Sequence, residues 1–362
     1  MSMSTSMSSL AHRIKLHKDF WDGTGMTEPL VSYRIGDCFF ANKFKANLPL
    51  LKQGKLVTPE MVDVDGHLED YERMFRESEA TGQTAFFTAD PCTGYPWMEA
   101  MLGCSVHGAE VSFVSGKKYS EIGEVPDLVV DEENPWYRKY MEFLVKLAEL
   151  SAGRFPVGQP IMRGVTDIVG ALAGQEEMAY SLVVEQDQVR KAFNDSAKSL
   201  KKVIEDQYKI VKPFHGGYAA GFYHLWAPGP IIWYQEDLSA LMSPRHFDEY
   251  LRDTSAYICE GYNYTFVHVH PSSFFHLDGM LSLESLRAVQ INKEEIGVPS
   301  VSDMLPQFEK VFNAGKALIL FGRLDEQDID LLREKFPQSR LFLNIVTPTV
   351  ESAQKLNKYI TG

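Results

Sequence analysis

From about residue 80 onward, the chain alternates between short apolar runs and longer amphipathic stretches. The short runs are rich in β-branched and aromatic residues, and Pro, Gly or Ser often follows them, a pattern typical of strands. We predict strands over 84–89, 109–114, 155–161, 230–237, 265–270, 288–292, 317–321 and 341–346.

The stretches between these runs repeat apolar residues at helical spacing. We predict helices over 136–151, 176–211, 244–262, 301–313, 326–336 and 350–360. Strand-then-helix alternation over about eight strands indicates a parallel sheet, and both the count and the length fit a (β/α)8 TIM barrel. An open doubly wound sheet is the alternative, although no Gly-x-Gly-x-x-Gly follows an early strand, as a dinucleotide-binding sheet would require.

The first 80 residues follow a different pattern. Residues 1–20 begin with small polar residues, and we predict a disordered tail there. Residues 21–80 are predicted to form a cap-like segment, with a strand over 31–37 and a helix over 65–76. The barrel is then expected to occupy 81–362.

Composition and charge exclude several classes of partner. The 362 residues carry a net charge of −13, and no Lys/Arg-rich block stands out. Nucleic acid and anionic membranes are therefore not expected as partners, since binding to either depends on clustered cations. No run approaches the ~20 apolar residues that span a bilayer, and the start lacks the apolar stretch of a signal peptide. The four cysteines have no Cys-x-x-Cys spacing. We therefore expect buried, reduced thiols in a cytoplasmic protein.

Two histidines follow one another on a predicted strand end. Side chains alternate along a strand, so His268 and His270 share one face at the carboxyl end, where α/β proteins usually build their sites. Neutral imidazole is a common zinc ligand, which suggests Zn²⁺; a pair of structural histidines is the alternative. A third ligand must come from another strand end. We assign Glu236 to the metal, and the other candidates are Asp90, Cys92, His224, Asp237, Glu294 and Asn344.

Other strand ends supply further candidates. We predict catalytic roles for Asp237, His270 and Asp90, because carboxylates and imidazoles at such positions can act as general acids or bases. Arg163 and Arg323 are strand-end cations that would clamp a substrate carboxylate or instead pair with a helix carboxylate. Three aromatic residues are predicted to form substrate-binding walls: Trp97, Tyr234 and Phe274. The aromatic, Gly-rich connection 216–226 is predicted to line the mouth of the site or an oligomer contact.

Four elements, taken in order, resemble the uroporphyrinogen decarboxylase superfamily over roughly residues 80 to 362. They are Met98-Glu-Ala-Met-Leu-Gly-Cys104, Gly164-Val-Thr-Asp-Ile, Gln235-Glu-Asp237 with a following Leu-Met-Ser-Pro-Arg-His-Phe, and His268-x-His270. The resemblance implies a (β/α)8 barrel whose active cleft lies at the carboxyl ends of the strands. It is also compatible with a homodimer.

The resemblance includes two chemistries. Porphyrinogen decarboxylases hold their substrate with an arginine-rich amino-terminal motif, whereas this chain has only Arg34 there, with Lys43 and Lys45 beyond it. The cobalamin-dependent methyltransferases bind zinc through His-x-Cys and a later Cys. Here His270 replaces the first Cys, and the region around Asn344 has no thiol, so a His/carboxylate metal site is implied. No Asp-x-His-x-x-Gly corrinoid signature occurs, so a corrinoid would sit on a separate protein.

The leading hypothesis is a metal-dependent methyltransferase that moves a methyl group from a small O- or N-methylated substrate to a corrinoid partner protein. The alternative is a cofactor-independent decarboxylase or related lyase of a small carboxylated substrate. In that enzyme Arg163 would hold the carboxylate, and His268 or Asp237 would protonate the carbanion. A third reading is a binding protein that keeps the barrel without its chemistry.

Overall fold

A parallel sheet of six strands forms the centre of the computed structural model, which describes residues 9–23, 26–36, 41–294 and 299–362. The strand order is β1-β11-β10-β9-β8-β7, and every neighbouring pair is parallel. The predicted strands from residue 230 onward are confirmed. The bounds are β1 (Leu30–Ile35), β7 (Ile231–Gln235), β8 (Tyr264–Val269), β9 (Ala288–Lys293), β10 (Ala317–Gly322) and β11 (Leu341–Thr347).

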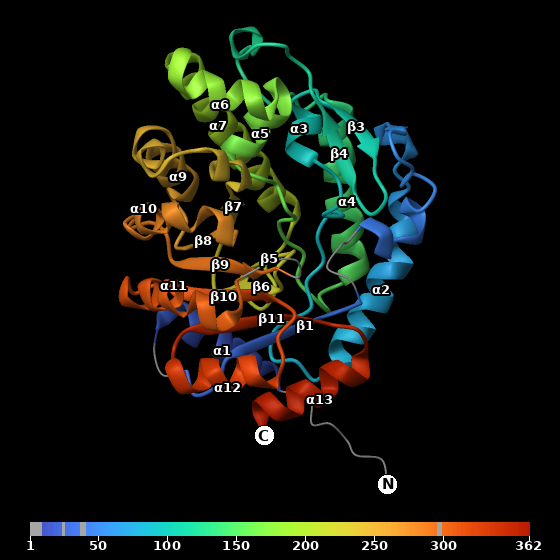
Figure 1. Ribbon diagram of the computed structural model, residues 1–362. Coiled ribbons are helices and arrows are strands. Elements are labelled where there is room, and N and C mark those ends of the chain that lie inside the picture. The colour runs from blue at the N-terminus through green and yellow to red at the C-terminus, as the bar shows by residue number, and fades with distance from the viewer. Residues whose placement is uncertain (1–8, 24–25, 37–40, 295–298) are drawn as a thin grey trace.

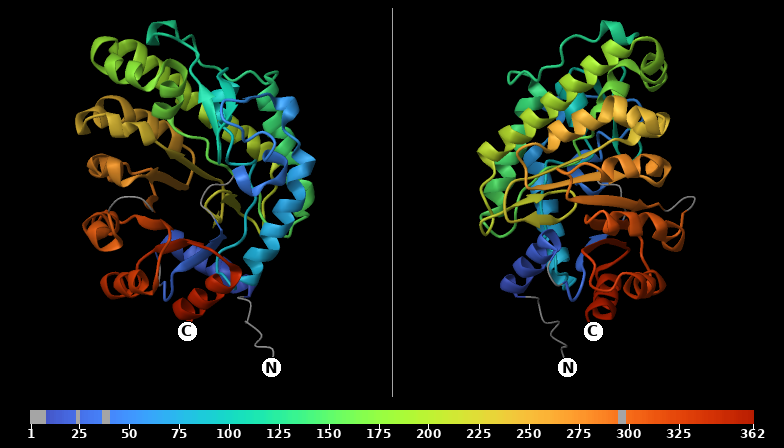
Figure 2. Two further views of the ribbon diagram at one scale, coloured as in Figure 1. Left: turned by 45° about the vertical axis from the view of Figure 1, so that its right-hand side comes forward. Right: turned by 90° about the vertical axis from the view of Figure 1, so that its left-hand side faces the viewer.

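Helices follow the strands and cover the outer face of the sheet, as Figures 1 and 2 show for α9 to α12. The predicted helices are confirmed, except that 176–211 is divided at Glu185 and 244–262 contains a π-helical stretch and ends at Cys259. The bounds are α1 (Leu10–Asp22), α2 (Val64–Ala80), α3 (Trp97–Met101), α4 (Pro135–Ser151), α5 (Val165–Ala173), α6 (Gln175–Val184), α7 (Gln186–Ile210), α8 (Pro244–His246), α9 (Arg252–Cys259), α10 (Leu277–Leu281), α11 (Val301–Asn313), α12 (Glu326–Lys335) and α13 (Val350–Thr361). None of these helices is long and apolar enough to cross a membrane.

Two predicted barrel strands, 84–89 and 155–161, do not form regular ladders. They make isolated parallel bridges, from Ala89 to Val157 and from Gly158 to Ala219 in the short strand β5 (Tyr218–Ala220), which pairs with β6 (Leu225–Ala227). Prolines 156 and 160 lack the N–H groups that a ladder needs. The fold is therefore barrel-like, but the described residues do not form a continuous eight-stranded ladder.

The predicted barrel strand 109–114 is wrong in a different way. Its last residues belong to β4 (Phe113–Gly116), which pairs antiparallel with β3 (Ser105–Gly108), and β3 pairs in turn with β2 (Leu56–Val57). The Ala109 N–H donates to the Ser112 carbonyl at 2.8 Å and closes the hairpin. This three-stranded sheet lies outside the central one.

The amino-terminal segment is more ordered than predicted. The tail prediction is wrong from residue 10 onward, because α1 buries Phe20 and Trp21 against the rest of the molecule, and residues 1–8 lie outside the described residues. The predicted strand over 31–37 forms as β1, which ends at Ile35, and residue 37 lies outside the described residues. It pairs with β11 and is thus part of the central sheet, not of a separate cap. The predicted helix over 65–76 is confirmed within α2.

The two faces of the sheet bury different residues. Outward-facing side chains such as Ile232 and Val267 pack under the helices, and inward-facing ones such as Trp233 and Phe266 form a second apolar cluster. Along each strand this inner cluster ends in polar residues near the carboxyl end, since alternate side chains share a face. These inward-facing polar residues are Arg34, Gln235, His268, Gln290, Asn292 and Asn344.

Candidate metal centre

Three side chains converge at the carboxyl ends of β7 and β8. The ligand atoms of Asp237, His268 and His270 all lie within 4.8 Å of one another. The Asp237 Oδ1 atom is 3.6 Å from His268 Nε2 and 3.7 Å from His270 Nε2. The two imidazole rings are nearly perpendicular, with their centres 4.6 Å apart. The predicted proximity of the two histidines is therefore confirmed, with Asp237 as the third group.

A second layer of polar groups orients both imidazoles. The Nδ1 atom of His268 is hydrogen-bonded to the Gln290 side-chain oxygen, and the Tyr223 hydroxyl lies 3.0 Å from the same atom. The Nδ1 atom of His270 is 2.5 Å from Glu294 Oε1. Because Nδ1 is occupied in both rings, both Nε2 atoms remain directed toward Asp237. This is the arrangement that metal-ligating histidines usually show.

The donor set fits a divalent metal ion. The Oδ1 atom of Asp237 is buried and has no hydrogen-bond partner among the described residues, which is costly unless another group satisfies it. Burial lowers the pKa of His268 below its ordinary value, although Asp237 opposes the shift, and this favours the neutral ring that binds metals. Two imidazoles and a carboxylate form a known set for catalytic zinc, and the same set suits Fe²⁺.

Two further carboxyl groups lie next to this cluster, and both resist ionisation. Burial, together with the nearby Asp237 and Glu236 carboxylates, raises the pKa of Asp167 well above its ordinary value. Burial also raises the pKa of Glu236 to about 7. A cation bound between Asp237 and the histidines would favour the ionised forms of these carboxyls.

Glu236, the carboxylate assigned to the metal from the sequence, is not part of the cluster of Asp237, His268 and His270. Its Oε1 accepts the Val165 N–H at 3.1 Å, and its Oε2 accepts the Thr166 N–H at 2.9 Å and the Thr166 hydroxyl at 2.7 Å. The carboxylate thus caps the amino end of α5. Asp237, predicted to be catalytic, is the carboxylate that lies beside the two histidines.

The cluster lies in a pocket of about 260 Å³. Phe222, Tyr223 and Phe321 form an aromatic wall, with the Phe222 and Tyr223 ring centres 4.7 Å apart. The Arg34 guanidinium is buried behind this wall, 4.5 Å from the centre of the Phe222 ring. The other residues lining the pocket are Thr93, Gly94, Ser112, Ile161, Gln235 and Asn292. The prediction that connection 216–226 borders the site is confirmed for Phe222 and Tyr223.

Asp90 lies behind the pocket wall. The Thr93 hydroxyl, on a residue that lines the pocket, donates to Asp90 Oδ2 at 2.5 Å. Burial raises the pKa of Asp90 to about 7, against the opposing effects of Thr93 and Arg34. The catalytic role of Asp90 stays a prediction, because Asp90 is not among the residues that line the pocket.

The predicted aromatic walls are in the core instead. Trp97 is fully buried in an aromatic cluster, and its Nε1 donates to the Cys92 carbonyl at 3.1 Å. Tyr234 faces the helices, since it alternates with the inward-facing Trp233 and Gln235. Phe274 packs against the same outer core. None of the three lines the pocket.

Neither predicted arginine clamp lines the pocket. Arg163 Nε lies 3.0 Å from Glu99 Oε1 in α3, which confirms the alternative that it pairs with a helix carboxylate. Arg323 follows β10 and is exposed. Its carbonyl accepts a hydrogen bond from Lys293 Nζ at 2.7 Å.

Sequence reasoning missed Gln290. It is the inward-facing residue of β9 opposite His268, and the parallel register pairs these two positions. A polar residue inside an apolar predicted strand was the available signal. His276, six residues after His270, donates from Nε2 to the Ser239 carbonyl at 3.0 Å and is not part of the cluster.

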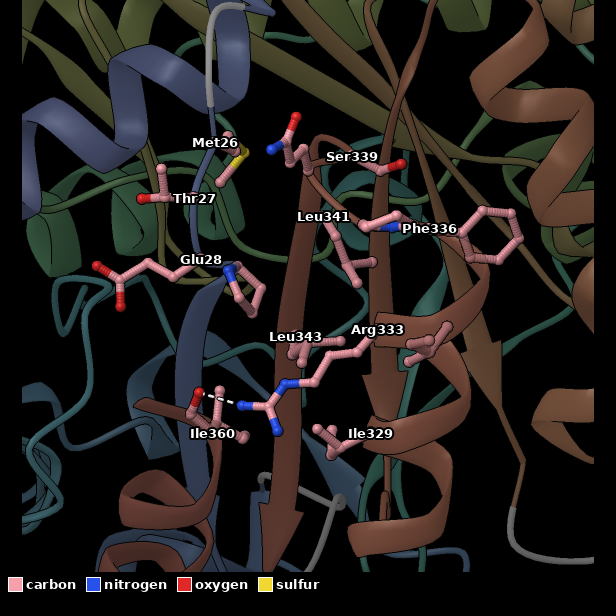
Figure 3. A pocket seen from close by; sticks show the side chains of 14 residues that line it. Met26, Thr27, Glu28, Ile329, Arg333, Phe336, Ser339, Leu341, Leu343 and Ile360 are labelled. Carbon is pink, nitrogen blue, oxygen red and sulfur yellow. Dashed lines mark hydrogen bonds between the residues drawn. The ribbon is translucent and has the colours of Figure 1, made fainter. Parts of the chain in front are cut away.

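A second pocket, of about 280 Å³, lies at the opposite edge of the sheet, beside the first residues of β11 (Figure 3). Its lining is mainly apolar, with Met26, Leu341 and Phe336 among the residues drawn. The Arg333 guanidinium crosses it and donates to the Ile360 carbonyl. Among the described residues, those around this pocket form no His/Cys/Asp/Glu cluster comparable to that at Asp237.

Comparison with known proteins supports the fold. A solved methyltransferase from Methanosarcina mazei aligns with a TM-score of 0.65 over 96% of this chain and 98% of that chain, at 11% sequence identity. At this identity the similarity establishes the fold alone. No model of a protein family and no curated protein matches the sequence. The resemblance to the uroporphyrinogen decarboxylase superfamily therefore stays a prediction.

Proposed function

We propose that this protein is a metal-dependent methyltransferase that moves a methyl group from a small O- or N-methylated substrate to a corrinoid on a partner protein. The observation that carries the proposal is the buried, unpartnered Asp237 Oδ1 facing the Nε2 atoms of His268 and His270 inside a pocket. The methyltransferase from Methanosarcina mazei, which shares the fold, adds support.

Asp237, His268 and His270 would hold the metal ion. Zn²⁺ bound there would supply Lewis acidity toward the oxygen or nitrogen from which the methyl group departs. Gln290 and Glu294 keep the imidazoles oriented, and the Gln235 amide donates to Asp237 Oδ2 at 2.7 Å. The carboxylate is thereby fixed with Oδ1 toward the histidines.

The remaining pocket residues would bind the substrate. Phe222, Tyr223 and Phe321 offer an apolar surface that excludes water from the group to be demethylated. Asn292 and Thr93 offer hydrogen bonds at its edge. A pocket of about 260 Å³ favours a small substrate over a porphyrinogen.

Decarboxylation has less support than methyl transfer. The cation predicted to grip a substrate carboxylate, Arg163, is paired with the buried Glu99. The Arg34 guanidinium lies behind the aromatic wall and does not line the pocket. No cationic side chain is therefore presented by the described residues that line the site.

The test is methyl transfer from a panel of methyl ethers and methylamines to free cob(I)alamin, followed by the absorbance of methylcobalamin. Zinc-loaded wild type is expected to catalyse transfer from at least one donor, and His268→Ala is expected to lose it. His107→Ala, in the outer sheet, is the matched control and is expected to behave as wild type. Absence of transfer from every donor, combined with CO₂ release from a carboxylated compound, would replace this proposal with the decarboxylase.

A further inference from the structure

Two segments that follow strand ends cap each other's N–H groups with carboxylates, next to the cluster of Asp237, His268 and His270. Asp167, in the first turn of α5, accepts the Asp237 N–H through Oδ2 at 3.2 Å and the Leu238 N–H through Oδ1 at 3.1 Å. Glu236 in turn caps the amino end of α5 through Val165 and Thr166. Each segment thus satisfies the exposed N–H groups at the start of the other.

Asp237 takes part in this mutual capping through its backbone N–H. It begins the short 3-10 helix η5 (Asp237–Leu241), whose own N-cap residue, Glu236, makes no side-chain cap to it. The donors at the start of such a helix need partners, and Asp167 supplies them from a separate strand end. The Asp167 side chain is buried, with 3% exposure.

The two segments also meet backbone to backbone at Gly164. A Cβ atom there would lie 1.7 Å from the Gln235 carbonyl oxygen and 2.4 Å from Glu236 Oε1. Only glycine permits this approach, since real Cβ atoms do not come within 3.0 Å of such atoms. The Gly164-Val-Thr-Asp167 motif therefore packs directly against the segment that carries Asp237.

The placement of Asp167 is unfavourable for stability alone. A buried carboxylate beside Asp237 and Glu236 suffers desolvation and like-charge repulsion. Asp303 makes a comparable N3 cap in α11, accepting the Ser300 N–H at 3.0 Å, but it is exposed. The cost at Asp167 is understandable if its position serves the site.

We propose that Asp167 is the positioning residue of the metal centre: it holds the backbone of Asp237 and Leu238 so that Asp237 Oδ1 faces both histidines. The inference rests on the proposed metal-dependent function. Asp167 itself lies outside the cluster of candidate ligands and acts through Asp237.

The test compares Asp167→Ala and Asp167→Asn with Asp303→Ala as the matched control. Co²⁺ titration gives the metal affinity, and the visible Co²⁺ absorption reports the ligand set. Hydrogen exchange over residues 235–241 reports the backbone without any metal. We expect Asp167→Ala to lose about 10- to 100-fold in Co²⁺ affinity, as for other outer-shell partners, with an altered spectrum. Exchange at the Asp237 and Leu238 amides should accelerate, and Asp303→Ala should change none of these readouts.

The outcomes separate this inference from the proposed function. If wild type binds Co²⁺ and a folded Asp167→Ala binds it with equal affinity and an identical spectrum, the positioning role is overturned. If wild type binds no Co²⁺, the proposed function fails, and unchanged exchange at Asp237 and Leu238 in the variant would overturn the positioning role as well. If Asp167→Ala does not fold, Asp167→Asn decides by the same readouts. Asn has nearly the same volume as Asp and keeps one acceptor oxygen.

Discussion

Replacing Arg163 by Met tests whether this arginine belongs to the fold or to the substrate site. Its Nε lies 3.0 Å from Oε1 of Glu99, whose side chain is fully buried, while the Arg163 side chain is 37% exposed. Met keeps much of the apolar stem and removes the charge, leaving the Glu99 carboxylate without its cation. Residue 163 has a positive φ of 58°, and Arg and Met bear the same backbone strain there. The substitution therefore tests the side chain alone.

The expected loss follows from the burial of the pair. Removing one partner of a fully buried ion pair costs roughly 3–5 kcal/mol. Because Arg163 is partly exposed, solvent screening weakens its share, and we expect about 2–3 kcal/mol.

The loss should also depend on pH. Burial raises the pKa of Glu99 above its ordinary value, and Arg163 opposes that shift, so the variant raises it further. A carboxyl whose folded pKa is raised contributes its stability below the unfolded pKa and loses it as pH rises through the folded pKa. The deficit of Arg163→Met should therefore be smaller at about pH 5 than at about pH 8.

Urea denaturation at both pH values measures this deficit. Glu99→Gln and the double variant Arg163→Met/Glu99→Gln serve as controls, and the double variant should recover most of the loss, because it removes the unpaired charge. An Arg163→Met protein as stable as wild type, with a raised KM for a carboxylated substrate, would refute this reasoning and restore Arg163 as a substrate clamp.

Three further predictions concern other buried positions. Gly164→Ala should lower the free energy of unfolding by about 1–3 kcal/mol through overpacking and should also weaken metal binding. The control Gly123→Ala should do neither, because its added Cβ would lie at an ordinary 3.5 Å from Glu185. Equal urea midpoints for the two variants would contradict this. Burial raises the folded pKa of Asp90 from 3.8 to about 7, so its contribution to stability is present below about pH 4 and is lost as pH rises toward 7. Asp90→Asn should therefore make the free energy of unfolding less dependent on pH over that window. An unchanged pH profile would show that Asp90 does not titrate there. Burial raises the thiol pKa values of Cys92, Cys104 and Cys259 to about 12. A thiol reagent at neutral pH should therefore label these cysteines only after denaturation. Rapid labelling of the native protein would show that the buried sites open.

The strands of the central sheet from β7 to β11 were predictable because each is a short apolar run buried on both faces. The segments 84–89 and 155–161 have similar composition, but prolines and tertiary contacts decide their backbone pairing. The Gln159 side chain, for example, pairs with the Trp233 backbone at 2.6 and 3.2 Å in place of a ladder. Residues 109–114 have β propensity as well, yet propensity does not indicate which sheet a strand joins.

The histidine pair was predictable from strand alternation, whereas its acidic partner was assigned to the wrong neighbour. Glu236 and Asp237 both follow β7, and the sequence alone offers two carboxylates. The inward register of Trp233 and Gln235 extends to Asp237 and favours it, a period-two argument that the sequence already contained. Trp97 shows the opposite limit, because an aromatic residue beside a Pro/Gly loop suits a core as well as a binding wall.

The metal content of the purified protein tests the central claim most directly. Elemental analysis of wild type and of His268→Ala/His270→Ala, with His107→Ala as a control, identifies the metal and its stoichiometry. The account predicts about one zinc per chain in wild type and the control, and none in the double variant. A folded wild-type protein that stays free of zinc and iron after both are added, or a double variant that keeps its metal, would contradict it.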